Sequence, residues 1–296
     1  MKLEHIGRIK GNITISTSMK AANILDGAYK SIFKGKSMNF EELREYNFGD
    51  NVKDIDWRAS ARSTNLLVRE YVAEKKHNVI FILDSKNEMN ANANMEDLKR
   101  DVSIDSAGTL AYLAYKNGDY TGAIYINNDM PRFFPLSQNL YSVENFLTCY
   151  EEDLKNRDKK DKSVNSIDDS LRYMTEYLSK KAVVFIITDL VGLEELTDDT
   201  LKTLSLRNDV MIINISDVSL FDSNSYDLDK KKYFSKLFLK NRKLYDIEQR
   251  EKIDTYNSLT EKFARYKITT VTISSREEVV SKVIELLEEH RNMKIK

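Results

Sequence analysis

Cysteine, proline and glycine are all scarce in this sequence. The single cysteine, Cys149, excludes an internal disulfide and fits a reducing compartment. Only two prolines and nine glycines among 296 residues argue against a disordered or fibrous chain. Because 41% of the residues are hydrophobic, the chain can bury a sizeable core, and its length suits one large domain with a smaller module.

An excess of charge of one sign and long apolar runs are also lacking. Lys and Arg total 46 against 47 Asp and Glu, so the net charge of −1 gives no global attraction to nucleic acid or to an anionic membrane. The longest apolar runs, such as residues 79–83, fall far short of the ~20 residues that span a bilayer. The first residues form no apolar signal core. We expect a soluble cytoplasmic protein with no nucleic-acid partner and no membrane insertion.

Motifs that bring catalytic chemistry are missing too. The sequence has no Walker A loop, no G-x-G-x-x-G after a strand and no G-x-S-x-G elbow. The three histidines, His5, His77 and His290, are far apart and have no zinc-binding spacing. Cys149 has apolar and aromatic neighbours on a predicted helix, which is typical of a core residue. We therefore expect a protein that is not an enzyme.

Short runs rich in Val and Ile alternate with helical patterns in the second part of the chain. Such runs are typical of strands that are covered on both faces. The predicted strands are residues 79–83, 121–126, 182–188, 210–215 and 268–273. The predicted helices are residues 95–116, 141–154, 168–178, 193–206, 243–266 and 276–290. This alternation predicts an α/β fold with a doubly wound, mainly parallel sheet over residues 77–296.

Residues 1–76 have a different pattern. Ile13 and Ile15 alternate with polar neighbours, and five of the nine glycines lie in this part. The pattern predicts a small turn- and strand-rich N-terminal module. Two polar stretches, residues 151–162 and 217–232, are expected to be exposed, either as solvated connectors or as docking surfaces.

Two carboxylates follow predicted strands directly. Asp84 comes after residues 79–83, and Asp189 comes after residues 182–188. Because ligands of open α/β sheets bind beyond the carboxyl ends of the strands, the two could hold a divalent cation. Each aspartate could instead cap the helix or turn that follows it.

The loop after Asp84 disfavours a metal. Lys86 and Glu88 stand where a loop that wraps a cation would have neutral oxygens. A lysine ammonium ~4 Å from a divalent ion would cost about 8 kcal/mol at an effective dielectric near 20. We therefore expect no cofactor, with Mg²⁺ as the disfavoured alternative, and we expect Lys86 to lie between Asp84 and Asp189 in place of a metal. Glu88 could itself be a ligand, which keeps the metal alternative open.

The most informative stretch is residues 35–74. Gly49 and Asp50 form a turn signal, and Asp54 or Asp56 can cap a short helix that carries Arg58 and Arg62 on one face. We expect the only tryptophan to be buried as an anchor and the arginines to pair with carboxylates. The stretch is either an internal network of ion pairs or a charged platform for a partner. The candidate residues are Arg44, Tyr46, Gly49, Asp50, Asp56, Trp57, Arg58 and Arg62.

A long spaced motif includes this stretch. Its residues are Gly27, Tyr29, Ser31, Lys34, Gly35, Phe40, Arg44, Tyr46, Gly49, Asp50, Lys53, Ile55, Asp56, Trp57, Ala59, Ala61, Arg62, Val68, Arg69, Tyr71 and Glu74. In this motif the chain resembles a large bacterial family, the domain of unknown function 58 family. A weaker resemblance continues through Asp84 and residues 188–190.

The resemblance implies a von Willebrand factor A-like fold and a role beside MoxR-type AAA+ ATPases. Family members often have Asp-x-Ser-x-Ser where this chain has Asp84, Lys86 and Glu88, and the family's later threonine falls near residues 165–166. We therefore expect a non-enzymatic, protein-binding adaptor for a MoxR-type ATPase, in the assembly or maturation of other proteins. The alternative is a metal-dependent hydrolase or phosphoryl-transfer enzyme with its site at Asp84 and Asp189.

Overall fold

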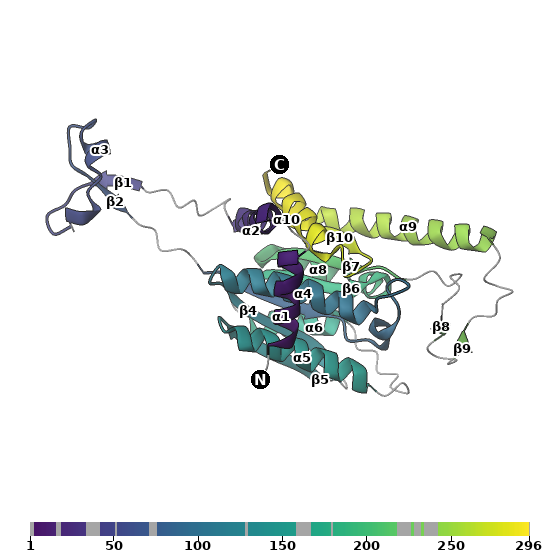
Figure 1. The fold of residues 1–296 in the computed structure, drawn as a ribbon. Helices are drawn as coiled ribbons and strands as arrows, with labels where there is room; N and C mark the ends of the chain where they lie inside the picture. Colours follow the sequence, from purple (N-terminus) through teal and green to yellow (C-terminus); the bar gives the residue numbers. More distant parts are fainter. Residues whose placement is uncertain are drawn as a thin grey trace. The chain divides into compact units, whose positions relative to one another are not determined.

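The computed structural model of the chain forms two compact units. The main unit comprises Met1–Ile32 and His77–Lys296, and the inserted unit comprises Phe33–Lys76 (Figure 1). The structure describes residues 3–15, 19–33, 42–50, 52–70, 76–127, 130–157, 167–178, 180–217, 226–227, 232–233 and 242–295.

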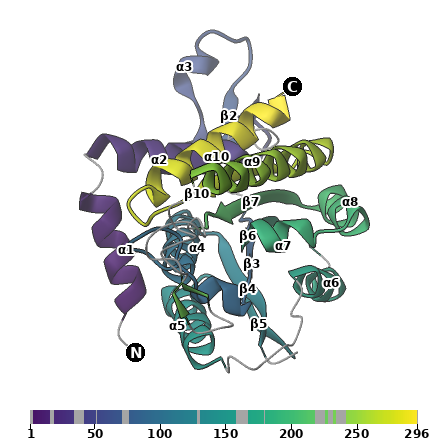
Figure 2. The ribbon, with the colours of Figure 1, turned by 90° about the vertical axis from the view of Figure 1, so that its right-hand side faces the viewer.

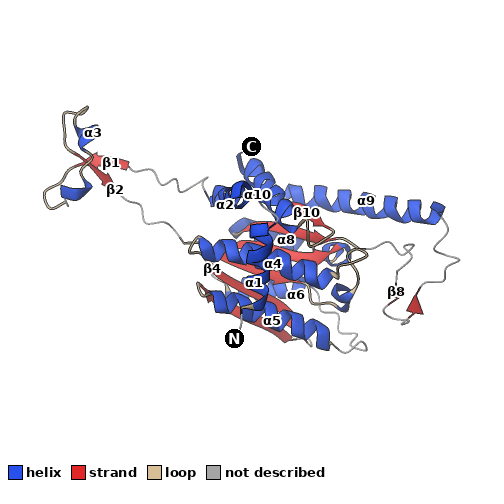
Figure 3. Ribbon diagram, viewed as in Figure 1, coloured by secondary structure: helices blue, strands red, loops and turns tan. Residues whose placement is uncertain are grey.

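A six-stranded sheet forms the centre of the main unit, with its strands in the order β10-β7-β6-β3-β4-β5 (Figure 3). All neighbours are parallel except β4 and β5, which are antiparallel. The strands are β3 (Asn78–Leu83), β4 (Tyr120–Asn127), β5 (Met130–Ser137), β6 (Val183–Asp189), β7 (Asp209–Ile215) and β10 (Thr269–Ile273). This confirms the predicted α/β fold with a doubly wound, mainly parallel sheet, and each predicted strand is present.

The sequence pattern missed β5, which lies at the edge of the sheet. Pro131 and Pro135, the two prolines of the chain, both lie in this strand. Proline has no N–H to donate to a ladder, so it is confined largely to edge strands, and it weakens a strand signal. The side chains of β5 are mostly half-buried or exposed, unlike those of the buried strands beside it.

Helices cover both faces of the sheet (Figure 2). Helices α4 and α5 lie on one face, where Phe81 of β3 stacks on Phe146 of α5 at 5.8 Å between ring centroids. Helices α6, α8 and α9 contribute buried side chains to the core on the other face. Within the described ranges no helix is both long and apolar enough to cross a membrane. The helices after β3 are α4 (Lys99–Lys116), α5 (Leu140–Asn156), α6 (Ile167–Tyr177), α7 (Leu190–Glu194), α8 (Asp198–Arg207), α9 (Arg242–Arg265) and α10 (Val279–Ile295).

Two of the helix predictions need correction. The helix expected at residues 95–116 begins only at Lys99, because residues 87–98 form a short 3-10 helix and a loop. The helix expected at 193–206 is two helices, because Thr197 caps α8 by accepting a hydrogen bond from the Thr200 amide.

The two polar stretches lie only partly within the described residues. Residues 151–156 of the first polar stretch continue α5, and residues 158–162 lie outside the described residues. Most of the second stretch, 217–232, is likewise outside them, apart from Asp217 and the short pair β8 (Tyr226–Asp227) and β9 (Lys232–Tyr233).

The N-terminal prediction was wrong in its first part. Residues 1–32 belong to the main unit, and this part of the chain contains two helices, α1 (Glu4–Ile15) and α2 (Met19–Phe33). The alternation of Ile13 and Ile15 suggested a strand, but Ile6, Ile9 and Ile13 recur at helical spacing and are buried. The turn- and strand-rich module is therefore limited to the inserted unit.

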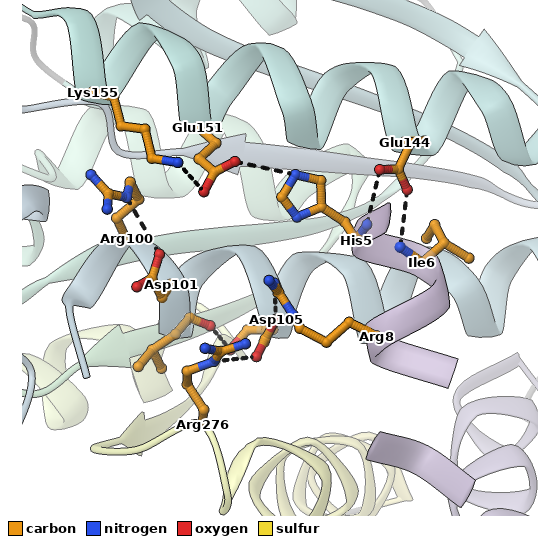
Figure 4. Close-up of polar contacts among 12 residues, drawn as sticks. His5, Ile6, Arg8, Arg100, Asp101, Asp105, Glu144, Glu151, Lys155 and Arg276 are labelled. Carbon is orange, nitrogen blue, oxygen red and sulfur yellow. Dashed lines mark hydrogen bonds and ion pairs between the residues drawn. The ribbon is translucent and has the colours of Figure 1, made fainter. Parts of the chain in front are cut away.

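Buried polar contacts fix α1 to α5 and α4 within the main unit (Figure 4). The carboxylate of Glu144, on α5, accepts hydrogen bonds from the amides of His5 and Ile6 at 2.9 Å each. It thus satisfies donors that the first turn of a helix leaves free. Buried Asp105, on α4, pairs with Arg8 at 2.6 Å and with Arg276 at 2.7 Å.

Packing of α1 also depends on a glycine in the middle of α4. A Cβ atom at Gly108 would lie 2.1 Å from the Cδ1 atom of Ile9. The side chain of Ile9 therefore rests directly on the backbone of α4.

The segments of the main unit on either side of the insertion meet at one buried carboxylate, that of Asp119. The hydroxyl of Tyr29, on α2, donates to Oδ2 of Asp119 at 2.8 Å. The amide of His77, the first residue after the insertion, donates to Oδ1 at 2.8 Å. Closely spaced ends are typical of a domain inserted into another, because they disturb the host fold little.

The inserted unit is built on a small antiparallel pair, β1 (Glu42–Glu45) and β2 (Leu67–Glu70). A 3-10 turn (Val52–Asp54) and the helical turn α3 (Trp57–Ser60) lie between the two strands. Ile55 and Val68 form a bridge and are the buried hydrophobic residues among those described in this unit.

Candidate functional site

The strand-end site lies where the chain order of the main sheet reverses. From β3 the chain proceeds to β4 and β5 on one side, and from β6 it proceeds to β7 and β10 on the other. Asp84 directly follows β3, and Asp189 is the last residue of β6. The amide of Asp84 donates to the carbonyl of Ile187 at 2.9 Å, which continues the pairing of the two strands. Open α/β sheets bind ligands at this switch point.

Asp84 is buried and fully hydrogen-bonded. Its Oδ2 accepts a hydrogen bond from the Thr188 hydroxyl at 2.5 Å, and its Oδ1 accepts one from the Lys86 amide at 2.9 Å. The hydroxyl of Tyr150 donates to its carbonyl oxygen. Burial, followed by the negative charge of Asp189, raises the pKa of the Asp84 carboxyl from 3.8 to about 6.

Helix α7 approaches this carboxylate through a glycine. A Cβ atom at Gly192 would lie 1.9 Å from the Thr188 hydroxyl and 2.7 Å from Oδ2 of Asp84. The amide of Gly192 donates to Oδ1 of Asp189 at 3.0 Å. Asp189 therefore caps α7, which is the structural alternative that the sequence left open for it.

Lys99 is the residue that sequence reasoning missed. It is the first residue of α4, and its side chain is 3% exposed. Its ammonium binds Oδ2 of Asp189 at 2.7 Å and also pairs with Asp217, which follows β7. Burial alone would lower the pKa of Lys99, but the charges of Asp189 and Asp217 outweigh it and raise that pKa. The site therefore holds a permanent ammonium ion from the protein itself.

Lys86 lies elsewhere than expected. Its ammonium pairs with Glu195, the residue after α7, so Lys99 and not Lys86 provides the cation at Asp189. Glu88 is exposed on the short helix that follows Asp84. Among the residues that the structure describes, no three His, Cys, Asp or Glu side chains gather as a metal site. Residues 165–166 lie outside the described residues.

The second candidate site is on the inserted unit, and its first element is a clamped turn. Both guanidinium NH₂ groups of Arg44 donate to Asp50, at 2.6 Å each, and the Asn47 amide donates to the same carboxylate at 2.8 Å. The hydrogen bonds from Arg44 lower the pKa of Asp50 to about 2. Gly49 has a φ of +109°, which other residues rarely adopt. The turn presents Phe48 with its side chain fully exposed.

The second element is the capped helical turn α3. Oδ1 of Asp56 accepts hydrogen bonds from the Arg58 and Ala59 amides at 3.0 Å each. The Ser60 hydroxyl donates to the Asp56 carbonyl at 2.7 Å and accepts from the Leu67 amide at 2.9 Å. These contacts attach α3 to β2. The backbone of Tyr46 extends the antiparallel pair by donating to the Leu66 carbonyl at 2.8 Å.

The predicted anchor role of Trp57 was wrong, since the side chain is 63% exposed. Helix α3 has four residues and none of them is buried. The small core of the unit is formed by Ile55 and Val68 instead. A helical turn of four residues has no apolar face that could bury an indole side chain against the rest of the unit.

The predicted pairing of the arginines is right for Arg44 and wrong for the other two. Arg44 binds Asp50, as described above. In the described part of the chain, Arg58 and Arg62 are exposed and neither has a carboxylate partner. The Arg62 amide donates to the Ala59 carbonyl at 3.0 Å, so Arg62 follows α3 within a further turn.

The fold and these sites define an α/β protein with a doubly wound sheet and an inserted, motif-bearing unit. The model of the family described as protein of unknown function DUF58 matches residues 42–224, and the chain belongs to this family. This confirms the family that the spaced motif indicated.

Relatives and solved structures are similar over parts of the chain. The uncharacterized proteins Rv1480 of Mycobacterium tuberculosis and Mb1516 of Mycobacterium bovis are 24% identical over 115 residues, 39% of this chain and 36% of their own length. An aerotolerance-related membrane protein from Bacteroides fragilis is 12% identical, with a TM-score of 0.43 over 72% of this chain and 99% of its own. The PilB minor pilin from Streptococcus sanguinis is 11% identical, with a TM-score of 0.47 over 77% and 65%.

Proposed function

We propose that this protein is a non-enzymatic adaptor that binds a MoxR-type AAA+ ATPase through its inserted unit. The adaptor would act in the cytoplasm, in the assembly or maturation of other proteins. The observation that carries the proposal is the 63% exposure of Trp57, the only tryptophan, on a helical turn capped by Asp56.

Several motif residues of the inserted unit support the presentation of exposed side chains. Arg44, Gly49 and Asp50 hold the turn that exposes Phe48, and Asp56 holds the turn that exposes Trp57. Trp and Arg are enriched among the residues that dominate protein–protein binding. Exposed aromatic side chains that stabilise no core are available for a partner to cover, as interaction sites require.

The alternative, a metal-dependent hydrolase at Asp84 and Asp189, is less well supported. The Lys99 ammonium already neutralises Asp189 at 2.7 Å. A divalent ion placed ~4 Å from that ammonium would meet a repulsion of about 8 kcal/mol at an effective dielectric near 20.

The proposal is tested by titrating the protein with a purified MoxR-type ATPase from the same organism. Calorimetry without nucleotide, with ADP and with a non-hydrolysable ATP analogue should show binding that is tighter in one nucleotide state. A nucleotide-driven change can bias binding only through such a difference in affinity. Trp57→Ala should weaken binding by at least about tenfold, as expected for a hot spot.

Leu206→Ala is the matched control, because this exposed side chain lies on α8 of the main unit. It should leave the affinity unchanged. Both substitutions should change the free energy of unfolding by less than about 1 kcal/mol, since both side chains are exposed. Absence of binding in every nucleotide state at tens of micromolar would refute the adaptor proposal.

A further inference from the structure

The exposed side chains of the inserted unit combine aromatic surface with positive charge. We use the name arginine–aromatic surface for the exposed side chains of Phe48, Trp57, Arg58 and Arg62 of this unit. Trp57 and Arg58 are neighbours on α3, and Arg62 follows Arg58 by four residues within the next turn. Residues four apart in a helical turn lie on one side of it.

The carboxylates described in this unit are already engaged. Asp50 binds Arg44, Glu45 accepts a hydrogen bond from the Asn65 side chain at 2.5 Å, and Asp56 accepts the amides at the start of α3. Where the structure describes side chains, Arg58 and Arg62 have no ion-pair partner. Among the residues that the structure describes, these two exposed guanidinium groups therefore have no counter-charge.

From this charge pattern we infer that the arginine–aromatic surface recognises an acidic segment of a partner protein. Carboxylates of the partner pair with Arg58 and Arg62, and an apolar side chain of the partner covers Trp57. Guanidinium groups bind carboxylates through paired, planar hydrogen bonds. This inference rests on the proposed function and gives the chemistry of the contact.

A protein partner fits this surface better than a nucleic acid. Affinity for nucleic acid comes mainly from many cations that neutralise successive phosphates. The chain as a whole has a net charge of −1, and the arginine–aromatic surface offers only the two guanidinium groups of Arg58 and Arg62, which have no ion-pair partner among the described residues. Phe48 and Trp57 supply the apolar contact that is typical of the buried centre of a protein interface.

The single tryptophan provides a direct assay in the full-length chain. Because Trp57 is the only tryptophan and is exposed, its emission reports the arginine–aromatic surface alone and should shift to shorter wavelength when a ligand covers it. The probes are a short peptide rich in Glu and Leu, its Gln/Leu and Lys/Leu counterparts, and a single-stranded RNA oligomer.

The Glu/Leu peptide should bind about fivefold more tightly than the Gln/Leu peptide, as expected for two exposed ion pairs. The double variant Arg58→Glu/Arg62→Glu should lose this preference and bind the Lys/Leu peptide instead. Arg58→Lys/Arg62→Lys should keep the preference for Glu, because it retains both charges.

A matched control changes the same number of charges on the main unit. Lys202→Glu/Arg207→Glu alters two exposed cations of α8 and should leave the peptide preference unchanged. All of these positions are exposed, so melting curves should show that the variants remain folded.

The outcomes separate this inference from the adaptor proposal. If the ATPase binds, but Arg58→Glu/Arg62→Glu does not weaken it and no peptide shows a charge preference, the acidic-segment inference is overturned and the adaptor stands. If the Glu/Leu peptide is preferred while the ATPase fails to bind, the ATPase is the wrong partner and the inference stands. RNA binding that is tighter than binding of any peptide and falls steeply with salt would overturn the inference in favour of a nucleic-acid surface.

Discussion

Lys99 and Asp189 form an ion pair buried at the carboxyl end of the main sheet, with 2.7 Å between Nζ and Oδ2. The two side chains are 3% and 2% exposed. They come from the first residue of α4 and the last residue of β6, 90 positions apart in the sequence. The strand-end site therefore carries its counter-ion within the fold.

Lys99→Met should lower the free energy of unfolding by about 3–5 kcal/mol, because it leaves a buried carboxylate without its partner. Urea denaturation measures this loss. Lys99→Met/Asp189→Asn should recover part of it, since Asp217 is then the one carboxylate that has lost the Lys99 ammonium. Addition of Mg²⁺ or a chelator should not change the melting temperature of the wild type. A rise with Mg²⁺ that Asp189→Asn abolishes would instead indicate a metal at this site.

Gly192→Ala should destabilise the protein, because its Cβ would lie 1.9 Å from the Thr188 hydroxyl. Overpacking of this kind costs about 1–3 kcal/mol. Gly11→Ala is the control, since Gly11 lies within α1 and a Cβ there meets nothing within 4 Å. That substitution should stabilise the protein by about 0.5–1 kcal/mol. Equal effects at the two positions in urea denaturation would contradict the close approach of α7 to β6.

The raised pKa of Asp84 predicts a specific pH dependence. Burial, then the charge of Asp189, raises this pKa from 3.8 to about 6 in the folded chain. The contribution of Asp84 to stability is therefore fully present below about pH 4 and is lost as the pH rises through 6. Asp84→Asn mimics the protonated acid, so its stability relative to the wild type should be higher at pH 7 than at pH 4. Glu88→Gln, at an exposed position, should show no such change when both are followed by urea denaturation.

The lowered pKa of His290 predicts a pH dependence of stability opposite to that of Asp84. Its side chain is buried, its Nδ1 lies 2.9 Å from the Thr269 hydroxyl, and burial followed by the charge of Lys294 lowers its pKa from 6.5 to about 4. The unfolded chain takes up this proton first, so stability is fully present above pH 6.5 and is lost as the pH falls to 4. The loss should reach up to about 3 kcal/mol. His290→Gln should flatten this part of the profile, and an unchanged profile would contradict the assignment.

The sequence was sufficient to predict the parallel strands of the sheet because most of them are buried on both faces. Strands such as β3 and β6 are continuous runs of Val, Ile and Phe, and this signal does not depend on their neighbours. The positions of Asp84 and Asp189 followed, since each directly ends such a run. β5 gave no such signal, because its prolines and its exposed positions break the pattern.

Lys99 was not predictable by the same reasoning. Its role depends on where the first turn of α4 meets β6, and that contact joins residues 90 positions apart. Trp57 was assigned to the core on residue type alone, but burial requires a partner surface that a helix of four residues does not supply. For α1, the spacing of Ile6, Ile9 and Ile13 was the helical signal that was available, and the shorter alternation at Ile13 and Ile15 obscured it.

The two prolines of β5 have a consequence for the behaviour of the chain at high concentration. The outer edge of a sheet is a template on which strands of other molecules can assemble, and this is a common route to aggregation. A proline in an edge strand occupies a position at which the backbone N–H of another residue would point outward, to solvent. Pro131 and Pro135 therefore deny an incoming strand two of the hydrogen-bond donors it would need. The scarce prolines of this sequence are placed where they oppose the growth of the sheet from molecule to molecule.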